Sequence, residues 1–367
     1  MSIMTLVFLV GGLGLLVLGG EWLVRGASRL AAISGVPPLI IGLTVVSFGT
    51  SAPELAVSTQ AVLGGQGDIA LGNVVGSNIF NILFILGISA LIGPLAVQRQ
   101  LIRVDVPLMI GASLALLLIS LDGSISPIDG IFLATSLFAY IGWQIIQSRR
   151  QKTAHTAAEG GSAQAPRDIR NIFFNLVLIG AGLGLLVLGS RWLVDSASTI
   201  ARFFGLSELI IGLTIVAVGT SLPEVAASVI AALRGERDIA VGNVIGSNLF
   251  NILGILGISS WFAPEGILVP AAALAFDIPV MVAVALACLP IFLTGFRVER
   301  WEGGLFLSYY IAYTAFLILT ASNHQALPVF SSAMATVVLP VTAVGLIILG
   351  IRAALQGNGW PQMPMKR

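Results

Sequence analysis

The chain has 367 residues, of which 57% are hydrophobic and 10% are charged, and its mean hydropathy is +1.00. Soluble domains carry about 25% charged residues and need a polar exterior, so this composition excludes a soluble protein and predicts an all-α polytopic membrane protein. A net charge of +1 without a basic tract gives no indication of nucleic acid binding, and the single Cys288 excludes a disulfide within the chain and a thiolate metal cluster.

The predicted spans fall into two sets, because a spanning helix needs roughly 20 mostly apolar residues. The first set lies at about 4–32, 37–63, 69–92, 102–120 and 126–147. After a polar stretch at 148–170, the second set lies at about 172–203, 207–232, 239–262, 268–294 and 302–321, and an eleventh segment lies at about 326–352. The chain is apolar from its first residues and lacks the basic region of a signal peptide, so we expect no targeting peptide.

Basic residues predict the orientation of these spans. If the polar stretch at 148–170 is a flexible cytoplasmic linker, counting spans places 16 of the 18 Lys and Arg on the cytoplasmic side. Only Arg191 and Arg202 fall toward the other side. We therefore expect the N-terminus outside and the C-terminus in the cytoplasm. The short linker favours a prokaryotic plasma (inner) membrane.

The two sets of spans repeat each other at an offset of 170 residues. DIALGNVVGSNIFNILFILGIS (68–89) and DIAVGNVIGSNLFNILGILGIS (238–259) agree at 18 of 22 positions. An odd number of spans per copy forces the second copy to enter the membrane from the opposite face, which is an inverted-topology repeat. We expect a five-helix repeat at 1–147, the linker at 148–170, an inverted five-helix repeat at 171–321, and an extra transmembrane helix with a cytoplasmic tail at 322–367.

Each copy has a proline and a glutamate in the middle of its second span. Pro53 has no N–H and its ring crowds the carbonyl of Gly49, so the helix must open there and free backbone carbonyls. Glu54 follows directly, and Pro223 with Glu224 is the repeat counterpart. Two carboxylates in mirrored motifs within a membrane predict a cation site, since an unneutralised charge at the bilayer centre costs at least about 2.5–3.5 kcal/mol. Such a site must hold cations or protons whenever its access changes from one side of the membrane to the other, which predicts obligatory exchange.

Helical spacing adds further oxygen-bearing side chains to this site. One face of the second span carries Ser47, Thr50, Ser51, Glu54 and Ser58, and one face of the third carries Asn73, Ser77 and Asn81. The counterparts are Ala217, Thr220, Ser221, Glu224 and Ser228, then Asn243, Ser247 and Asn251. An all-oxygen set suits Ca²⁺ and Na⁺ rather than zinc or copper, and neither histidine lies in a span. Two roles are open for Asn73, Asn243, Asn78 and Asn248, which either bind cations or tie helices together. We expect Asp105 and Asp277 to cap helices, and Trp22 and Trp192 to pack against neighbouring side chains. Close approach of helices is expected at Gly72, Gly76, Gly242 and Gly246.

The doubled motifs GTSxPE and GNxxGSNxFN resemble the cation/calcium antiporter superfamily, in its sodium/calcium exchanger family, over about residues 1–321. The resemblance implies ions bound between the second, third, seventh and eighth spans, and a first and sixth span that slide as a pair. It also implies side-chain ligands at Ser51, Glu54, Ser77 and Asn81 and at Ser221, Glu224, Ser247 and Asn251, with backbone carbonyls at Ser47, Thr50, Ala217 and Thr220. Several exchangers carry an aspartate at the position of Asn251, so this amide leaves the coupling ions open.

These features predict a secondary active antiporter that exchanges Ca²⁺ for Na⁺, without an enzymatic activity or a resident cofactor. An H⁺/Ca²⁺ antiporter with the same site is the alternative, although the proton-coupled branch typically has a different acidic motif. A passive channel usually assembles symmetric subunits or charged rings instead. An intramembrane hydrolase would need a base, but both histidines and both lysines lie outside the spans.

Overall fold

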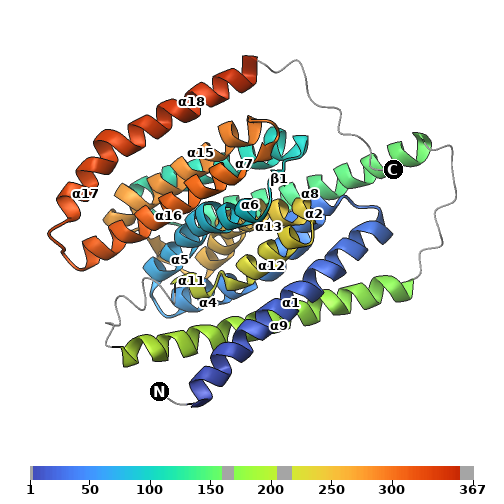
Figure 1. The fold of residues 1–367 in the computed structure, drawn as a ribbon, viewed down its shortest axis with the longest axis horizontal. Helices are drawn as coiled ribbons and strands as arrows, with labels where there is room; N and C mark the ends of the chain where they lie inside the picture. The colour runs from blue at the N-terminus through green and yellow to red at the C-terminus, as the bar shows by residue number, and fades with distance from the viewer. Residues whose placement is uncertain (1–2, 159–168, 205–216, 356–367) are drawn as a thin grey trace.

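The computed structural model describes residues 3–158, 169–204 and 217–355 (Figure 1). This part of the chain is helical except for four two-residue strands, as the composition predicts. Within it, nine helices are long and apolar enough to cross a membrane, and the bent pair Pro38–Thr50 and Ala52–Leu63 makes a tenth span. The predicted span at 207–232 lies partly outside the described residues, which contain it from Ala217 onward.

The first repeat contains four continuous spans and one broken span. Several helices include a π-helical segment, a local widening that is frequent at functional sites. The elements are α1 (Ile3–Ser34), α2 (Pro38–Ile41), π-helical η1 (Gly42–Val46), α3 (Ser47–Thr50), α4 (Ala52–Leu63), α5 (Gly67–Phe80), π-helical η2 (Asn81–Leu86), α6 (Gly87–Ile92), β1 (Leu95–Ala96), π-helical η3 (Leu101–Asp105), α7 (Val106–Ile119), 3₁₀-helical η4 (Ser120–Asp122), β2 (Ser124–Ile125) and α8 (Pro127–Ala158).

The described part of the second repeat has the same order of spans and strands, with small differences in its 3₁₀ segments. Its elements are α9 (Ile169–Phe203), α11 (Ala217–Gly219), α12 (Leu222–Leu233), α13 (Arg237–Leu249), π-helical η6 (Phe250–Leu256), α14 (Gly257–Ser259), 3₁₀-helical η7 (Ser260–Phe262), β3 (Ile267–Leu268), π-helical η8 (Ala273–Asp277), α15 (Ile278–Leu293), β4 (Arg297–Val298) and α16 (Arg300–Ala321). After it come α17 (Leu327–Ala333), π-helical η9 (Met334–Val338) and α18 (Leu339–Leu355).

Two antiparallel strand pairs join the repeats at short connections. Strand β1 pairs with β4, with Leu95 opposite Val298, and β2 pairs with β3, with Ser124 opposite Leu268. Each pair takes one strand from each half, and the two pairs are mirrored in chain order. The arrangement is what two inverted copies around a pseudo-two-fold axis produce.

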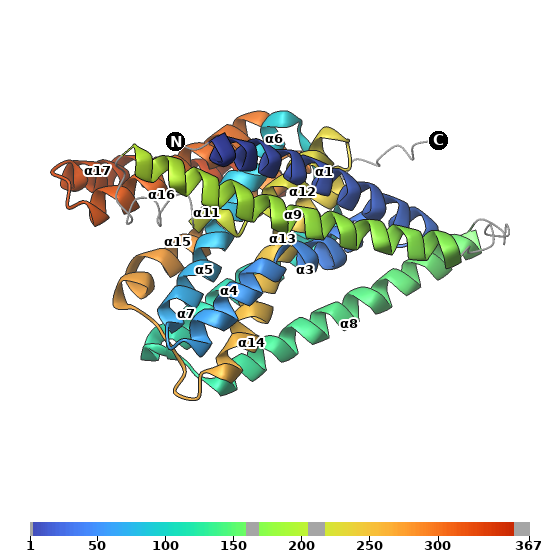
Figure 2. The same ribbon diagram turned by 90° about the horizontal axis from the view of Figure 1, so that it is seen from below.

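Helices α1 and α9 form a crossed pair along one side of the molecule, outside the inner helices (Figures 1 and 2). They meet at glycines. A Cβ atom on Gly12 would lie 2.9 Å from the carbonyl oxygen of Gly189, and one on Gly19 would lie 2.7 Å from that of Gly182. Small residues at such crossings let two membrane helices approach closely. The Trp192 ring packs edge-on against Phe8 at 4.9 Å between ring centroids, as expected for a packing role.

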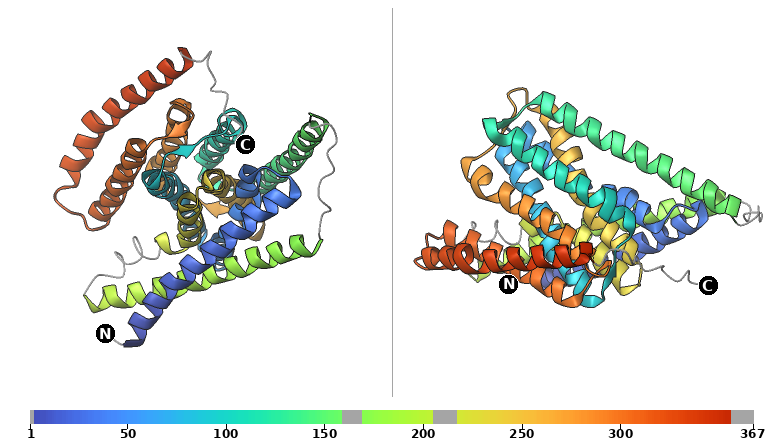
Figure 3. Two further views of the ribbon diagram at one scale, coloured as in Figure 1. Left: turned by 45° about the vertical axis from the view of Figure 1, so that its right-hand side comes forward. Right: turned by 90° about the horizontal axis from the view of Figure 1, so that it is seen from above.

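Two segments extend away from the inner helices (Figure 3). The span that begins at Leu327 packs beside α15 and α16, where Tyr309 shares a hydrogen bond with Thr342, and has no buried residue. Its apolar side chains are suited to lipid. Helix α8 continues to Ala158, beyond the expected end of the fifth span at 147 and into the stretch predicted to be a linker.

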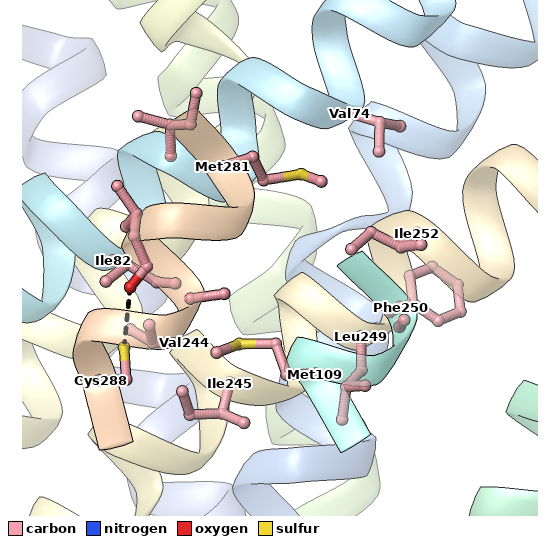
Figure 4. Packing of buried hydrophobic residues seen from close by; sticks show 14 of the residues in the cluster. Val74, Ile82, Met109, Val244, Ile245, Leu249, Phe250, Ile252, Met281 and Cys288 are labelled. Atoms are coloured by element: carbon pink, nitrogen blue, oxygen red, sulfur yellow. Dashed lines mark hydrogen bonds between the residues drawn. The ribbon is translucent and has the colours of Figure 1, made fainter. Parts of the chain in front are cut away.

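The inner helices pack around α5 and α13. In the span Arg237–Phe262, every residue from Ile239 to Gly257 is buried. Figure 4 shows Met109, Val244, Ile245 and Cys288 in this core, where the Cys288 thiol donates a hydrogen bond to the carbonyl of Val284 in the same helix. A Cβ on Gly246 would lie 2.6 Å from the carbonyl of Leu43, which confirms the predicted close approach in the second copy. At Gly72 and Gly76, an added Cβ would meet no neighbouring atom within 4 Å among the described residues, so the close approach predicted there is not seen.

The prediction that Asp105 and Asp277 cap helices is wrong. Neither side chain makes a cap hydrogen bond, because each residue lies inside a continuous helix where a π-helical segment passes into an α-helix. Asp105 instead accepts a hydrogen bond from the Tyr140 hydroxyl at 2.9 Å, and Asp277 accepts one from Tyr313 at 2.8 Å. These carboxylates tie neighbouring spans together.

Candidate functional site

The two GTSxPE motifs break their helices in the same way. Helix α3 ends at Thr50, Ser51 leaves the helical conformation at φ −83° and ψ 5°, and α4 starts at Ala52 with a bend of 44°. Ser221 has nearly the same conformation, at φ −89° and ψ 6°, before α12. Each glutamate therefore sits in the first turn of a new helix, where the helix dipole favours a negative charge.

The two glutamates are held by serines from the opposite half of the molecule. The Ser51 hydroxyl donates to Oε1 of Glu224 at 2.9 Å, and the Ser221 hydroxyl donates to Oε1 of Glu54 at 3.0 Å. All four residues are at most 1% exposed. The crossed pair of hydrogen bonds brings the mirrored motifs together in the protein interior, as the inverted repeat predicts.

Several oxygens around this pair lack a partner. Ten buried side-chain atoms of the described residues have no hydrogen bond, and half of them belong to predicted site residues. The five are Oε2 of Glu54, Oε2 of Glu224, Oδ1 of Asn81, Oδ1 of Asn251 and Oγ of Ser247. A buried polar atom without a partner costs about 1–3 kcal/mol, and more when it is charged. Carboxylate, amide and hydroxyl oxygens are the ligand types that Ca²⁺ and Na⁺ prefer, so these five atoms are candidate cation ligands.

The asparagines at 78 and 248 orient the candidate ligand amides. The Nδ2 of Asn81 donates to Oδ1 of Asn248 at 3.0 Å, and Nδ2 of Asn251 donates to Oδ1 of Asn78 at the same distance. Each of these amide hydrogen bonds leaves the carbonyl oxygen of Asn81 or Asn251 free. Of the two roles that the sequence left open for Asn78 and Asn248, the structure supports tying helices: their own amides reach across to the other half's backbone and to a methionine sulfur.

A second layer of hydrogen bonds braces the two breaks. The Thr50 hydroxyl donates to Oδ1 of Asn243 at 3.1 Å, and the Thr220 hydroxyl donates to Oδ1 of Asn73 at 3.3 Å. The amides of Asn243 and Asn73 then donate to Ser228 and Ser58, at 2.9 and 3.0 Å. Side chains of one half thus fix the conformation of the other half. This interdigitation gives Asn73 and Asn243 a structural role in the conformation described.

The remaining predicted ligands lie around the same centre. The hydroxyls of Ser77 and Ser221 share a hydrogen bond at 3.1 Å between their oxygens. The Ser47 hydroxyl turns back to the carbonyl of Leu43 at 2.8 Å, and the Ser47 carbonyl accepts the N–H of Ser51 at 3.0 Å. Ala217 is the first residue of α11. The carbonyl ligands at Ser47, Thr50, Ala217 and Thr220 stay predictions.

No basic side chain neutralises the site within the described residues. Their ion pairs join Glu21 to Arg25 and Arg234, and Arg297 to Glu299. The described residues contain no group of three or more His, Cys, Asp or Glu side chains that could hold a metal ion, and the two glutamates alone do not make one. A divalent cation or two monovalent ones would balance the two glutamates, and hydroxyl and amide oxygens would complete the coordination.

Comparison with known proteins agrees with this geometry. The family described as sodium/calcium exchanger protein matches residues 4–146 and 174–319, one match for each repeat. The inner membrane protein YrbG of Escherichia coli (strain K12) is 43% identical over 262 residues, covering 70% of this chain and 79% of its own. The sodium/calcium exchanger MaX1 of Methanosarcina acetivorans is 33% identical and covers 83% of this chain and 96% of its own.

A more distant relative and a solved structure complete the comparison. The Ca(2+)/H(+) antiporter ChaA of Bacillus subtilis is 28% identical over 78% of this chain and 85% of its own. The solved structure of the sodium-calcium exchanger NCX_Mj soaked with 10 mM Na⁺ and zero Ca²⁺ has a TM-score of 0.73 and 32% identity, and covers 88% of this chain and 99% of its own.

Proposed function

Because the chain belongs to the sodium/calcium exchanger family, a family of membrane cation transporters, we propose that it is a secondary active antiporter that exchanges Ca²⁺ for Na⁺. The observation that carries the proposal is the set of five unpaired buried oxygens around the crossed Ser51–Glu224 and Ser221–Glu54 hydrogen bonds. One Ca²⁺ neutralises both glutamates. Sodium ions can do the same and use the neutral oxygens as ligands.

The physical basis of exchange is the cost of an empty site. Glu54 and Glu224 are each 1% exposed and have no basic partner among the ion pairs of the described residues. Two ionised carboxylates in that environment repel each other and lack water, so crossing the membrane requires a bound cation. Alternating access by a mobile α1/α9 pair around this fixed site would then return the protein only when a second cation has replaced the first.

The GTSxPE motif favours sodium over protons as the coupling ion, and the neutral ligands are compatible with sodium. A proton needs only a carboxylate, whereas Na⁺ also needs several neutral oxygens, which Asn81, Asn251 and Ser247 supply without partners of their own. Proton coupling is the second candidate, since the site has only two acids and the relative ChaA is named a Ca(2+)/H(+) antiporter. We further propose an inner membrane location with the N-terminus outside, which rests on the bias of basic residues and on the inner membrane relative.

The test is calcium uptake into proteoliposomes under separately imposed gradients. We expect an outward Na⁺ gradient at equal pH to drive uptake, and a K⁺ gradient of the same size to drive none. Uptake that follows only a pH gradient would replace sodium by protons in this proposal. No uptake under any of the three gradients would reject calcium antiport.

A further inference from the structure

Helix α9 makes a hydrogen bond to the broken seventh span. The hydroxyl of Ser190, which is 7% exposed, donates to the carbonyl of Gly219 at 2.5 Å. Four residues later stands Pro223, which has no N–H to offer that carbonyl. A helix of the outer pair therefore supplies the donor that the proline removes, two residues before Ser221 and five before Glu224.

The first repeat cannot form the mirrored bond. At the offset of 170, Gly49 corresponds to Gly219 and Gly20 corresponds to Ser190. Pro53 leaves the Gly49 carbonyl without its helical donor in the same way, but glycine has no hydroxyl. Among the described residues, the hydrogen bond from Ser190 to the helix break therefore has no counterpart in the first half.

A second bond shows the same asymmetry. Glu21 of α1 forms an ion pair with Arg234 at the end of α12. The repeat counterparts of these two residues are Arg191 and Gly64, which cannot form an ion pair. Both interactions fasten the α1/α9 pair to the second half of the molecule.

The packing of α9 also distinguishes this conformation from its mirror image. A Cβ on Gly49 would lie 2.4 Å from Leu183, and one on Gly219 would lie 2.5 Å from Val194, so α9 covers both breaks. In an inverted repeat, the opposite access state arises when the two halves exchange conformations. Helix α1 would then cover the breaks, and Gly20 would stand where Ser190 stands now.

We propose that Ser190 is a positioning residue for transport, whose hydroxyl holds α9 on the Gly219 carbonyl and favours this access state over its mirror image. The inference rests on the proposed alternating access. It deepens that function by naming one hydrogen bond that shifts the equilibrium between the two access states. Loss of a single neutral hydrogen bond changes an equilibrium roughly two- to tenfold.

The test is the ratio of access states, read by single-molecule fluorescence between dyes on Phe203→Cys and Leu268→Cys. Both positions are exposed, at 64% and 65%, while the native Cys288 is buried and will not compete for dye. We expect Ser190→Ala to lower the ratio of this state to its mirror image roughly two- to tenfold. Ser190→Thr, which keeps a hydroxyl, should restore the ratio.

Two variants of Gly20 provide a matched comparison. Both Gly20→Ala and Gly20→Ser place a Cβ near the end of the Ile230 side chain, but only serine adds the mirrored hydroxyl. Gly20→Ser should therefore populate the mirror state more than Gly20→Ala does. Equal ratios for the wild type, Ser190→Ala and Ser190→Thr would overturn the inference, as would identical ratios for the two Gly20 variants. The readout needs no ion flux, so a failure of sodium-driven calcium uptake is recognised separately.

Discussion

Replacing Glu54 by glutamine removes one of the two charges in the site while it keeps the shape of the side chain. Oε1 of Glu54 accepts the Ser221 hydroxyl, and a glutamine carbonyl can do the same. The amide NH₂ then takes the place of Oε2, the oxygen that has no partner. A Ca²⁺ bound there would lose a ligand, meet an N–H donor and keep one positive charge uncompensated.

The size of this effect follows from the burial of the site. Glu54 is 1% exposed, so water cannot replace the missing charge. Removing one partner from a buried charge pair costs about 3–5 kcal/mol, which corresponds to roughly two to three and a half orders of magnitude in affinity. We expect Glu224→Gln to weaken calcium binding to a similar extent, since Glu224 has the mirrored contacts.

Binding of ⁴⁵Ca²⁺ to the purified protein measures the effect without transport. Thermal unfolding in the same detergent shows whether the variants remain folded. Glu265→Gln is the matched control because this carboxylate is exposed, and its affinity should equal that of the wild type. Calcium affinity within a few-fold of wild type in both Glu54→Gln and Glu224→Gln would refute the assignment of the site.

Three further variants test other parts of the site. Asn251→Asp adds a third carboxylate beside the pair, so the sodium and pH dependence of calcium flux should change more than expression does; an unchanged profile would count against a ligand role. Asn78→Ala removes the acceptor that orients the Asn251 amide, and we expect roughly a tenfold loss of calcium affinity, measured by ⁴⁵Ca²⁺ binding. Affinity equal to that of the wild type would contradict the orienting role. Truncation after Asn323 removes the span at Leu327–Arg352, which has no buried residue, so sodium-driven calcium uptake should persist; complete loss in a folded, inserted protein would show that this span is needed.

Much of the fold could be predicted because lipid and repetition limit the possibilities. Spans follow from apolar length, and the offset of 170 residues with five spans per copy requires an inverted pair. The glutamates could be found because a carboxylate beside a proline in a span is costly without a function. The crossing of Ser51 to Glu224 and Ser221 to Glu54 is consistent with that two-fold relation.

The parts that could not be predicted depend on partners far along the chain. Asp105 precedes a proline and was expected to cap a helix, but its partner is Tyr140, 35 residues later. The sequence pattern also gave Asn78 two open roles, and only the packed structure shows its carbonyl accepting from Asn251. The repeat itself is asymmetric at Ser190 and Gly20, and again at Glu21 and Arg191, and only the packed structure shows what these differences do.

The central claim is that the site of Glu54 and Glu224 does not change its access from one side of the membrane to the other unless it holds a cation. The most direct measurement is efflux of ⁴⁵Ca²⁺ from loaded proteoliposomes into a medium whose only added cation is choline, at equal pH on both sides. We predict that calcium stays inside until Na⁺ or unlabelled Ca²⁺ is added to the medium. Efflux into choline at the rate seen with Na⁺ would contradict it.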